Sequence, residues 1–398
     1  MTGRDPGTRS CFAVAAPGLE RVVASEIGQL GIHAHATPGG VAFDGDRHAL
    51  YQANLCLRTA TRVLVRIADF RATAFYELEK RARAVPWAEY LAPGRPVAFR
   101  VTARASRLYH QGAIEERLLD AVARAGGAPA PPAPTRPGAG PAAEDDLGED
   151  AQLFVVRVLR DQVTVSADSS GAPLHRRGYR QELAKAPLRE TLAAAMLLAS
   201  RWDAASPLVD PLCGSGTIPI EGALLARAIA PGLAAPGLGA RAFAFQHWAA
   251  FEPSAWERVL ARARERARPT APAPVLAADR DAGAIAATRA NAERAGVAGD
   301  IDVRQQSVSA LEPPPGPGWL VTNPPYGKRV GESKPLRDLY ATLGRLARTR
   351  LPGWHLALLS ADRALEAQLG LDAEELFRTR NGGIPVRLLA AHIAARDA

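Results

Sequence analysis

The most specific chemical signal in the chain is Asn323-Pro324-Pro325-Tyr326-Gly327, which follows an apolar stretch at residues 319–322. Each proline fixes its own φ angle and donates no backbone hydrogen bond. The Asn323 side-chain oxygen and the Pro324 carbonyl are then left to accept from an exocyclic NH2 group, while Tyr326 can stack on a planar base. An ordinary Pro-Pro turn is the alternative. The segment predicts catalysis by positioning and electrostatics, with no metal or covalent nucleophile.

A glycine-rich turn precedes it in the chain: Asp210-Pro-Leu-Cys213-Gly214-Ser215-Gly216-Thr217. Placed between a strand and a helix, such a turn points backbone N–H groups and a helix N-terminus at a ligand. The spacing is not that of a dinucleotide fingerprint, and no Gly-Lys-Ser/Thr of a phosphate loop follows. The acidic residue suits a cation such as the ammonium and sulfonium of S-adenosylmethionine. A simple βα turn is the alternative, with Cys213 as a small packing residue.

A third segment, Asp279-Arg280-Asp281, closes the next predicted strand. A carboxylate at that position can accept from both hydroxyls of a ribose. We therefore assign Asp279 and Arg280 to the cofactor site. The alternative for Asp279 is to cap the next helix, a task for which Asp281 is better placed.

These segments need a scaffold that brings strand ends together. Apolar stretches predict strands at residues 207–210, 275–278, 301–304, 319–322 and 355–360. Helical spacing predicts helices at 188–202, 218–228, 281–295, 331–350 and 364–369. Strands that alternate with helices indicate a doubly wound, mostly parallel sheet.

The N-terminal part reads as smaller α+β units. Strands are predicted at 10–15, 41–43, 61–70 and 96–103, with a hairpin at 153–159 and 162–167. Helices are predicted at 18–30, 48–55, 75–85 and 114–125. Residues 126–150 are rich in Pro, Gly and Ala without periodicity, which predicts a flexible insertion.

Composition limits the function classes. The 398 residues suggest about two or three domains. The net charge is +8, which favours a polyanionic partner such as RNA. Only four of the 49 basic residues are Lys, a bias typical of a GC-rich genome. The three cysteines are widely spaced, no Cys/His cluster exists, and nothing pairs with His175, His247 or His355 at ligand spacing, so we expect no metal and a reducing cytosol. No apolar run predicts a membrane span or signal peptide.

Two further stretches, Leu174-His-Arg-Arg-Gly-Tyr-Arg180 and Ala186-Pro-Leu-Arg-Glu-Thr-Leu-Ala193, join the glycine turn and the Asn-Pro-Pro-Tyr segment in one pattern. The chain thereby resembles the THUMP-domain, class I S-adenosylmethionine-dependent RNA guanine-N2 methyltransferases, and within them the 23S rRNA group. The resemblance implies a ferredoxin-like region at 1–60, a THUMP RNA-binding domain at 61–170 and a Rossmann-like methyltransferase domain at 171–398. It also implies that the target guanine leaves its stack and enters a pocket beside Asn323.

The resemblance assigns further residues. Pro187, Leu188, Glu190 and Thr191 match a stretch that helps to hold the cofactor. Ser307 stands where the family usually has an acidic residue for the adenine amine, so Ser307 and the Val308 backbone N–H are the expected adenine contacts. The arginines Arg176, Arg177 and Arg180, with Lys328 and Arg329, are expected to meet RNA phosphates. For the three arginines the alternative is a solvated linker or ion pairs within the fold.

Other readings stay open. A tRNA guanine-N2 methyltransferase shares these motifs, and DNA adenine or protein glutamine methyltransferases use the same planar-amine segment. A non-enzymatic RNA-binding assembly factor with an inactive methyltransferase domain is the alternative from another class, supported only by Ser307. We expect Trp248 and Phe251 to be core residues rather than a substrate platform.

Overall fold

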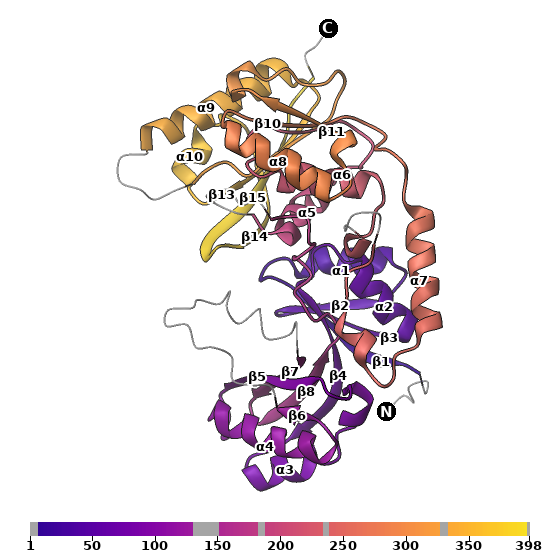
Figure 1. Cartoon of the computed structure of the whole chain (residues 1–398). Helices are drawn as coiled ribbons and strands as arrows, with labels where there is room; N and C mark the ends of the chain where they lie inside the picture. The colour runs from indigo at the N-terminus through magenta and orange to yellow at the C-terminus, as the bar shows by residue number, and fades with distance from the viewer. Residues whose placement is uncertain (1–6, 130–150, 182–187, 234–238, 327–332, 396–398) are drawn as a thin grey trace.

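The structure is a computed structural model that describes residues 7–129, 151–181, 188–233, 239–326 and 333–395. Figure 1 shows an N-terminal part below and a C-terminal part above, with one long helix beside the lower part. Each part is built around its own sheet.

The N-terminal part contains one eight-stranded sheet in the order β2-β3-β1-β4-β8-β7-β5-β6. Its strands are β1 (Arg9–Val14), β2 (Ala34–Thr37), β3 (Gly40–Gly45), β4 (Arg62–Arg71), β5 (Pro96–Arg104), β6 (Ala128–Pro129), β7 (Gln152–Leu159) and β8 (Gln162–Asp168). Its helices are α1 (Glu20–Gln29), α2 (Arg47–Cys56), α3 (Phe75–Ala82) and α4 (Gln111–Arg124). Strand β4 pairs with both β1 and β8, so the segments on either side of residue 60 share one sheet.

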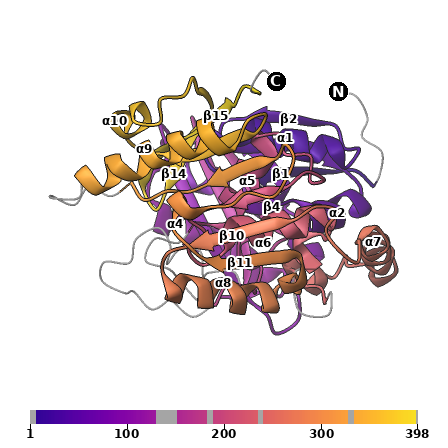
Figure 2. The same cartoon turned by 90° about the horizontal axis from the view of Figure 1, so that it is seen from above.

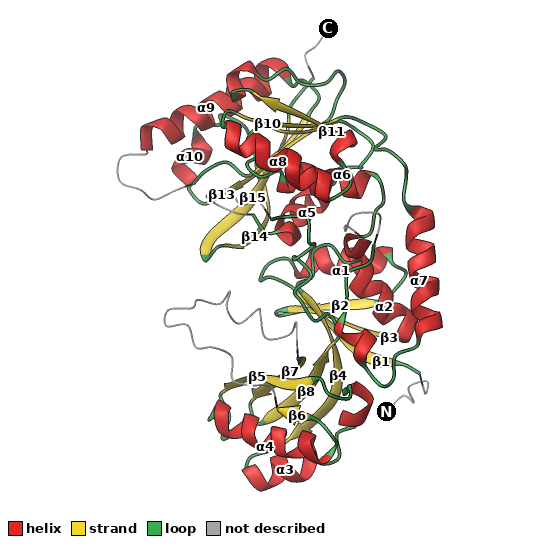
Figure 3. Ribbon diagram, viewed as in Figure 1, coloured by secondary structure: helices red, strands yellow, loops and turns green. Residues whose placement is uncertain are grey.

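Side chains alternate across this sheet because successive residues of a strand point to opposite faces. Val63, Phe99 and Phe154 lie in the core with the helices, which Figure 3 shows gathered on one side of the sheet. The neighbouring residues Leu64 and Val155 lie on the opposite face, where no described helix packs.

The C-terminal part has a seven-stranded sheet in the order β11-β10-β9-β12-β13-β15-β14. Its strands are β9 (Leu208–Asp210), β10 (Val275–Asp279), β11 (Ile301–Gln305), β12 (Trp319–Thr322), β13 (His355–Ser360), β14 (Glu374–Asn381) and β15 (Ile384–His392). Its helices are α5 (Glu190–Ala199), α6 (Thr217–Ala226), α8 (Ala282–Arg294), α9 (Ser333–Arg350) and α10 (Arg363–Ala367). The strands from β11 to β13 run parallel, whereas β15 pairs antiparallel with β13 and β14.

Both faces of this sheet are covered, which confirms the expected doubly wound, Rossmann-like α/β fold. On β10, Val275 and Ala277 belong to the core cluster that includes residues of α5, α6 and α8. Leu276 and Ala278 belong to a second cluster with residues of α9. Figure 2 shows α8 and α9 on opposite sides of β10. Such near-continuous apolar strands are typical of parallel sheets.

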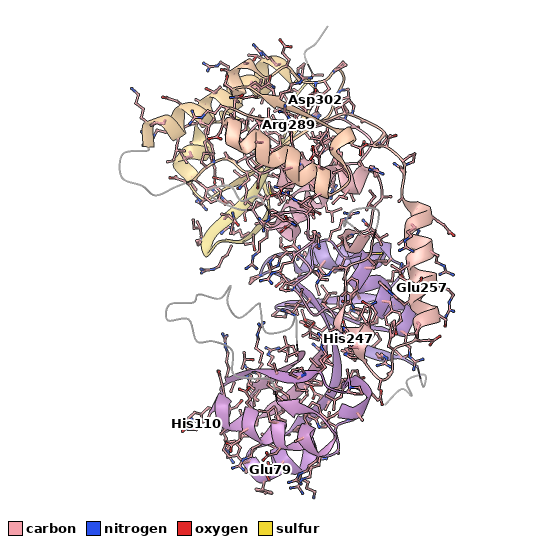
Figure 4. The ribbon with its side chains drawn as sticks, viewed as in Figure 1. Glu79, His110, His247, Glu257, Arg289 and Asp302 are labelled. Atoms are coloured by element: carbon pink, nitrogen blue, oxygen red, sulfur yellow. The ribbon has the colours of Figure 1, made fainter. Side chains whose placement is uncertain are left out.

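A segment between α6 and β10 leaves the C-terminal part and packs on the N-terminal part. It contains α7 (Pro253–Arg266), which packs against α2. Phe245 stacks on Tyr51 of α2 with ring centroids 4.4 Å apart, and Trp256 meets the same ring edge-on. Figure 4 labels His247 and Glu257 on this strap, beside the N-terminal part. The strap accounts for the long interval between Asp210 and Asp279.

The predicted strands and helices are present, with shifts of a few residues at their ends. Trp248 is buried, as expected of a core residue. Strands β2, β6, β14 and β15 and helix α7 were not predicted. Strand β6 lies at the start of the expected flexible insertion, and residues 130–150 of that insertion lie outside the described residues. The sequence of β14 is highly charged and only partly buried, so it lacks the apolar run by which a strand is recognised.

Removing the Phe245 ring tests the strap. Phe245 is completely buried, so Phe245→Ala leaves a cavity where the ring meets Tyr51 and is expected to cost about 3–5 kcal/mol of folding free energy. Urea unfolding followed by tryptophan fluorescence measures this loss. Tyr76→Ala, at a ring that is 70% exposed, is the control and should change the midpoint little. A midpoint of Phe245→Ala equal to that of the control would contradict the packing role of the strap.

Candidate active site

The three predicted segments meet at the carboxyl ends of β10, β9 and β12, which are neighbours in the sheet. Chain connections diverge to opposite sides of β9 there, which is the position where open α/β sheets bind ligands. A hydrogen bond of 2.7 Å from Thr322 Oγ1 to Asp210 Oδ1 joins the end of β12 to the end of β9. Because Thr322 directly precedes Asn323, this bond ties the glycine turn to the amine segment. Thr322 was not predicted as a site residue from the sequence, although its place next to Asn323 was a usable signal.

Asp210 is almost completely buried, and burial raises the pKa of its carboxyl to about 7. Hydrogen bonds from Thr322 and from the Leu212 backbone N–H oppose this rise. The neighbouring Asp279 also raises this pKa, and no Lys or Arg among the described residues contributes to the shift, so these residues give the ionised form no counter-charge. A cationic ligand beside Asp210 would supply it.

The glycine turn is held by α8. Gly214 and Gly216 both have positive φ, and a Cβ atom on Gly216 would lie 2.7 Å from Thr288 Cγ2. Thr288 donates to the Gly214 carbonyl at 2.9 Å, and Asn291 donates to the Ser215 carbonyl at 2.9 Å. Neither Thr288 nor Asn291 was singled out from the sequence. The turn requires glycine at residue 216 both for its conformation and for this close packing.

The other predicted members of this turn are also placed. Cys213 is buried, with its Sγ 3.5 Å from Thr288 Oγ1, and burial raises the pKa of its thiol well above its ordinary value. A thiol in this environment stays protonated, as expected of a packing residue. Ser215 and Thr217 are buried, and Thr217 begins α6.

Asp279 lies at the end of β10, where its carboxylate accepts from the Gly214 N–H at 3.1 Å and the Asp281 N–H at 3.0 Å. Asp281 caps α8 by accepting from Ala284, which confirms the capping role expected of it. Arg280 beside them is exposed. The carboxylate of Asp279 thus connects β10 to the glycine turn and lies at the edge of the same site.

The segment after β11 lies next to Asp279, because the Gln306 N–H donates to the Asp279 carbonyl at 3.0 Å. Ser307 is exposed and its hydroxyl lies 3.0 Å from that of Ser309, while Val308 is buried. The buried Nε2 of Gln306 has no hydrogen-bond partner among the described residues. Gln306 was not anticipated from the sequence.

The side-chain oxygen of Asn323 is a buried acceptor at the end of β12. This Oδ1 atom has no hydrogen-bond partner among the described residues, although buried acceptors are normally paired. Pro324 is buried and Pro325 is exposed. Tyr326 is half-buried, burial raises the pKa of its phenol, and its oxygen accepts from Asn381 at 2.6 Å. Lys328 and Arg329 lie outside the described residues.

The segment at the start of α5 is internal. Leu188, Glu190 and Thr191 are buried, and Pro187 lies outside the described residues. Arg180 forms an ion pair with Glu190 at 3.0 Å and donates to the Leu188 carbonyl at 2.8 Å. Burial raises the pKa of Glu190 to about 7 against the opposing effect of Arg180.

The expected RNA contact is corrected for Arg177. Its guanidinium is buried, pairs with Glu221 of α6 at 3.3 Å and donates to the Arg58 carbonyl at 2.6 Å. A side chain so enclosed cannot reach an RNA phosphate in this structure. Arg180 is likewise occupied by Glu190, whereas Arg176 is exposed. The alternative of ion pairs within the fold therefore describes Arg177 and Arg180.

Across the described ranges, no group of three His, Cys, Asp or Glu side chains is arranged to hold a metal ion. Within the same ranges, no helix combines the length and the apolar content needed to cross a membrane.

The raised pKa of Asp210 predicts how stability depends on pH. An acid whose pKa is higher in the folded than in the unfolded state stabilises the fold when protonated, so stability falls as pH rises from about 4 to about 7. Asp210→Asn removes this titration. When the pH is raised from about 5 to about 8, the free energy of unfolding of Asp210→Asn should increase by about 3 kcal/mol relative to that of the parent protein.

Urea unfolding at both pH values measures this difference. Glu190 titrates alike in both proteins and cancels. Asp302→Asn, at an exposed carboxyl on the outer part of the C-terminal sheet (Figure 4), controls for the loss of one negative charge. An Asp210→Asn effect that is the same at both pH values would refute the raised pKa.

Comparison with known proteins agrees with this geometry. Residues 177–390 match the family model of the RMKL-like methyltransferase domain, and residues 10–64 match that of the RlmL ferredoxin-like domain. "Putative RNA methyltransferase slr0064" of Synechocystis sp. is 35% identical over 392 residues, which cover 96% of each chain. The crystal structure of SMU.472, complexed with SAH, superimposes with a TM-score of 0.84 at 29% identity and covers 99% of this chain and 100% of that one.

The "Ribosomal RNA large subunit methyltransferase K/L" of Syntrophotalea carbinolica is 36% identical over 395 residues, 96% of this chain. The matched region is 53% of that protein, so the chain spans about half the length of this relative. The two family matches and the relative that is covered over 96% of its length agree with one another. The chain belongs to the RMKL-like methyltransferase family and has an RlmL-type ferredoxin-like domain at its N-terminal end.

Proposed function

We propose that this protein uses S-adenosylmethionine to methylate the exocyclic N2 amine of a guanosine in 23S rRNA. The observation that carries the proposal is the buried Oδ1 of Asn323, which has no hydrogen-bond partner among the described residues and lies next to the Thr322–Asp210 hydrogen bond. An unpaired buried acceptor is costly, and an NH2 group of a substrate would satisfy it. The structure of SMU.472 contains SAH, the demethylated product of this cofactor, which supports the choice of cofactor.

The residues fit a cationic ligand that also carries hydroxyl groups. Asp210 offers a buried carboxylate that a positive charge would stabilise, and Asp279 offers a carboxylate at the neighbouring strand end. Gly214 and Gly216 keep the turn free of side chains. When bound there, S-adenosylmethionine supplies an electrophilic methyl group.

The chain's own contribution is to hold the amine. Asn323 Oδ1 and the Pro324 carbonyl accept the two N–H bonds, which directs the nitrogen lone pair away from them. Tyr326 stacks on the base and fixes its plane. Holding the amine and the methyl group in line makes a bimolecular step effectively unimolecular, and this positioning accounts for the rate enhancement. Once its nitrogen carries the methyl group, the amine is positively charged and loses a proton to solvent, so no general base is required.

The open face of the N-terminal sheet supports RNA as the substrate. Alternation along β4, β5 and β7 places basic side chains on this face, where no described helix packs; they are Arg66, Arg71, Arg100, Arg104 and Arg157. Two acids on the same face are engaged, since Asp69 accepts from Thr164 and Asp168 pairs with Arg62, while Asp44 lies near Arg66. An exposed basic surface of this kind suits a phosphate backbone.

This basic face continues toward the C-terminal part. A cavity of about 250 Å³ is lined by Leu64, Arg100 and Val155 from the sheet and by His175 and Arg189 from the connection into α5. Arg189 directly precedes Glu190, so RNA on the sheet would lie beside the entrance to the C-terminal part. We assign the THUMP-type RNA-binding role at residues 61–170 to this face.

The assignment to 23S rRNA rests on the motif resemblance and is supported by the name of the relative from Syntrophotalea carbinolica. One similar structure, 30% identical, is described as a predicted N6-adenine-specific DNA methylase from Listeria monocytogenes. Because the Asn-Pro-Pro-Tyr segment can hold any planar amine, the identity of the methylated nucleoside has to be measured.

The central test compares the protein with Asn323→Ala. Both are incubated with radiolabelled S-adenosylmethionine and RNA from a strain that lacks the gene, with the large rRNA, small rRNA and tRNA kept separate. We expect label as N2-methylguanosine in the large rRNA and a loss of at least about 100-fold in Asn323→Ala, because the amine loses its acceptor. Calorimetry should show unchanged cofactor affinity in the variant.

Asn291→Ala is a matched control at another asparagine, whose amide supports the glycine turn, and it should weaken cofactor binding instead. Label in tRNA would replace the rRNA assignment with the tRNA one. Label as N6-methyladenosine would overturn the guanine assignment. Cofactor binding without any transfer to RNA or ribosomal precursor particles would favour the non-enzymatic assembly factor.

The basic face gives a separate prediction. Arg104→Glu and Arg157→Glu should each raise the Kd for RNA several-fold and lower the salt dependence of binding by about one unit of slope. Arg81→Glu, an exposed arginine on α3, is the charge-matched control. Filter binding over a range of salt concentrations measures both effects. Equal losses in all three variants would show that net charge acts, and not this face.

A further inference from the structure

The hairpin β14–β15 reaches into the amine segment. Asn381, the last residue of β14, donates from Nδ2 to the Tyr326 hydroxyl oxygen at 2.6 Å. Gly382 and Gly383 form the turn, both with positive φ, and Asn381 pairs with Ile384 across it. A tight turn of this kind fixes where the Asn381 side chain points.

The hairpin is itself held firmly. Residues 387–392 of β15 pair with β13, which is the parallel neighbour of β12 and thus of the strand that leads to Asn323. On the side of the hairpin, Arg387 of β15 forms an ion pair with Glu366 of α10 and lies 3.5 Å from Glu375 of β14. The donor of Asn381 is therefore presented from a rigid support and not from a free loop.

Strand β14 also contacts the N-terminal part. A Cβ atom at Gly18 would overlap the carbonyl oxygen of Arg378, so the two backbones lie in direct contact. Gly18 has a φ of +89°, and Glu20 holds this turn by accepting from the Gly18 N–H at 2.8 Å. Arg378 and Asn381 are three residues apart on β14, or about 10 Å along a strand.

We propose that Asn381 is a positioning residue for methyl transfer, which fixes the Tyr326 ring as the platform for the target base. Strand β14 links this platform to the N-terminal part through the Gly18–Arg378 contact. The inference rests on the proposed function. Tyr326 follows two prolines, so its backbone is constrained, and the contact at its hydroxyl holds the far end of its ring in place.

The test removes the hydrogen bond from either side. Asn381→Leu keeps the side-chain volume but cannot donate, and Tyr326→Phe keeps the ring but cannot accept. With the RNA that the parent protein methylates, each variant should lower kcat about tenfold, while the affinity for S-adenosylmethionine and the melting temperature stay unchanged. The double variant should be no slower than the slower single variant, because both changes remove the same bond.

Asn381→Asp provides rescue, since its carboxylate can accept from the Tyr326 hydroxyl and should restore most of kcat. Ile384→Ala changes the residue paired with Asn381 and should leave kcat unchanged; its side chain is already 43% exposed. Full activity of Asn381→Leu, or losses that multiply in the double variant, would overturn the positioning role. A parent protein without methyl transfer to RNA would instead overturn the proposed function.

The link to the N-terminal part is tested by Gly18→Ala against Gly31→Ala. Both glycines have positive φ, so both substitutions introduce similar backbone strain, but a Cβ at Gly31 meets no atom within 4 Å. Only Gly18→Ala should lower kcat, and the loss should disappear when Asn381→Leu is already present. Equal kcat in the two alanine variants would remove β14 as a link and leave the Asn381 contact to be judged by its own variants.

Discussion

The site depends on the order of three parallel strands, β10-β9-β12, and on the hydrogen bond that joins two of their ends. Strand order brings Asp279, Asp210 and Asn323 to one edge although they are far apart in the chain. The bond from Thr322 to Asp210 then fixes the distance between the cofactor turn and the amine segment. Because Asp210 is buried and has no cationic partner within the described ranges, the same bond also limits the free-energy cost of keeping its carboxyl there.

Buried polar groups hold the chain where its two parts meet. Glu221 of α6 receives Arg177 at 3.3 Å and Tyr179 at 3.0 Å, which anchors the connection between the sheets. Within the N-terminal part, Glu26 accepts from the Thr59 hydroxyl and backbone N–H groups. Buried charges gain little net stability, since desolvation offsets their attraction. Their role here is to fix the arrangement of the segments, because these hydrogen bonds and ion pairs can form in only one arrangement.

The chain crosses between the two parts more than once. The connection into α5, the strap that carries α7 and the contact between Gly18 and β14 each touch both parts. Several separate attachments oppose rotation better than a single linker would. The basic face of the N-terminal sheet is thereby held at a defined place relative to Asn323, as required if RNA on one part is to deliver a base to the other.

The sequence alone determined the α/β class and most elements, because hydrophobic periodicity is local and the core of each sheet is large. It also singled out Asp210, Asp279 and Asn323, because these residues lie in short contiguous motifs at predicted strand ends. Tertiary structure decided what depends on distant partners. Arg177 looked like an RNA ligand until its burial against Glu221 was visible, and Asn381 carried no signal because its partner Tyr326 is 55 residues away. Contacts between distant segments depend on tertiary packing, and a local sequence pattern does not predict them.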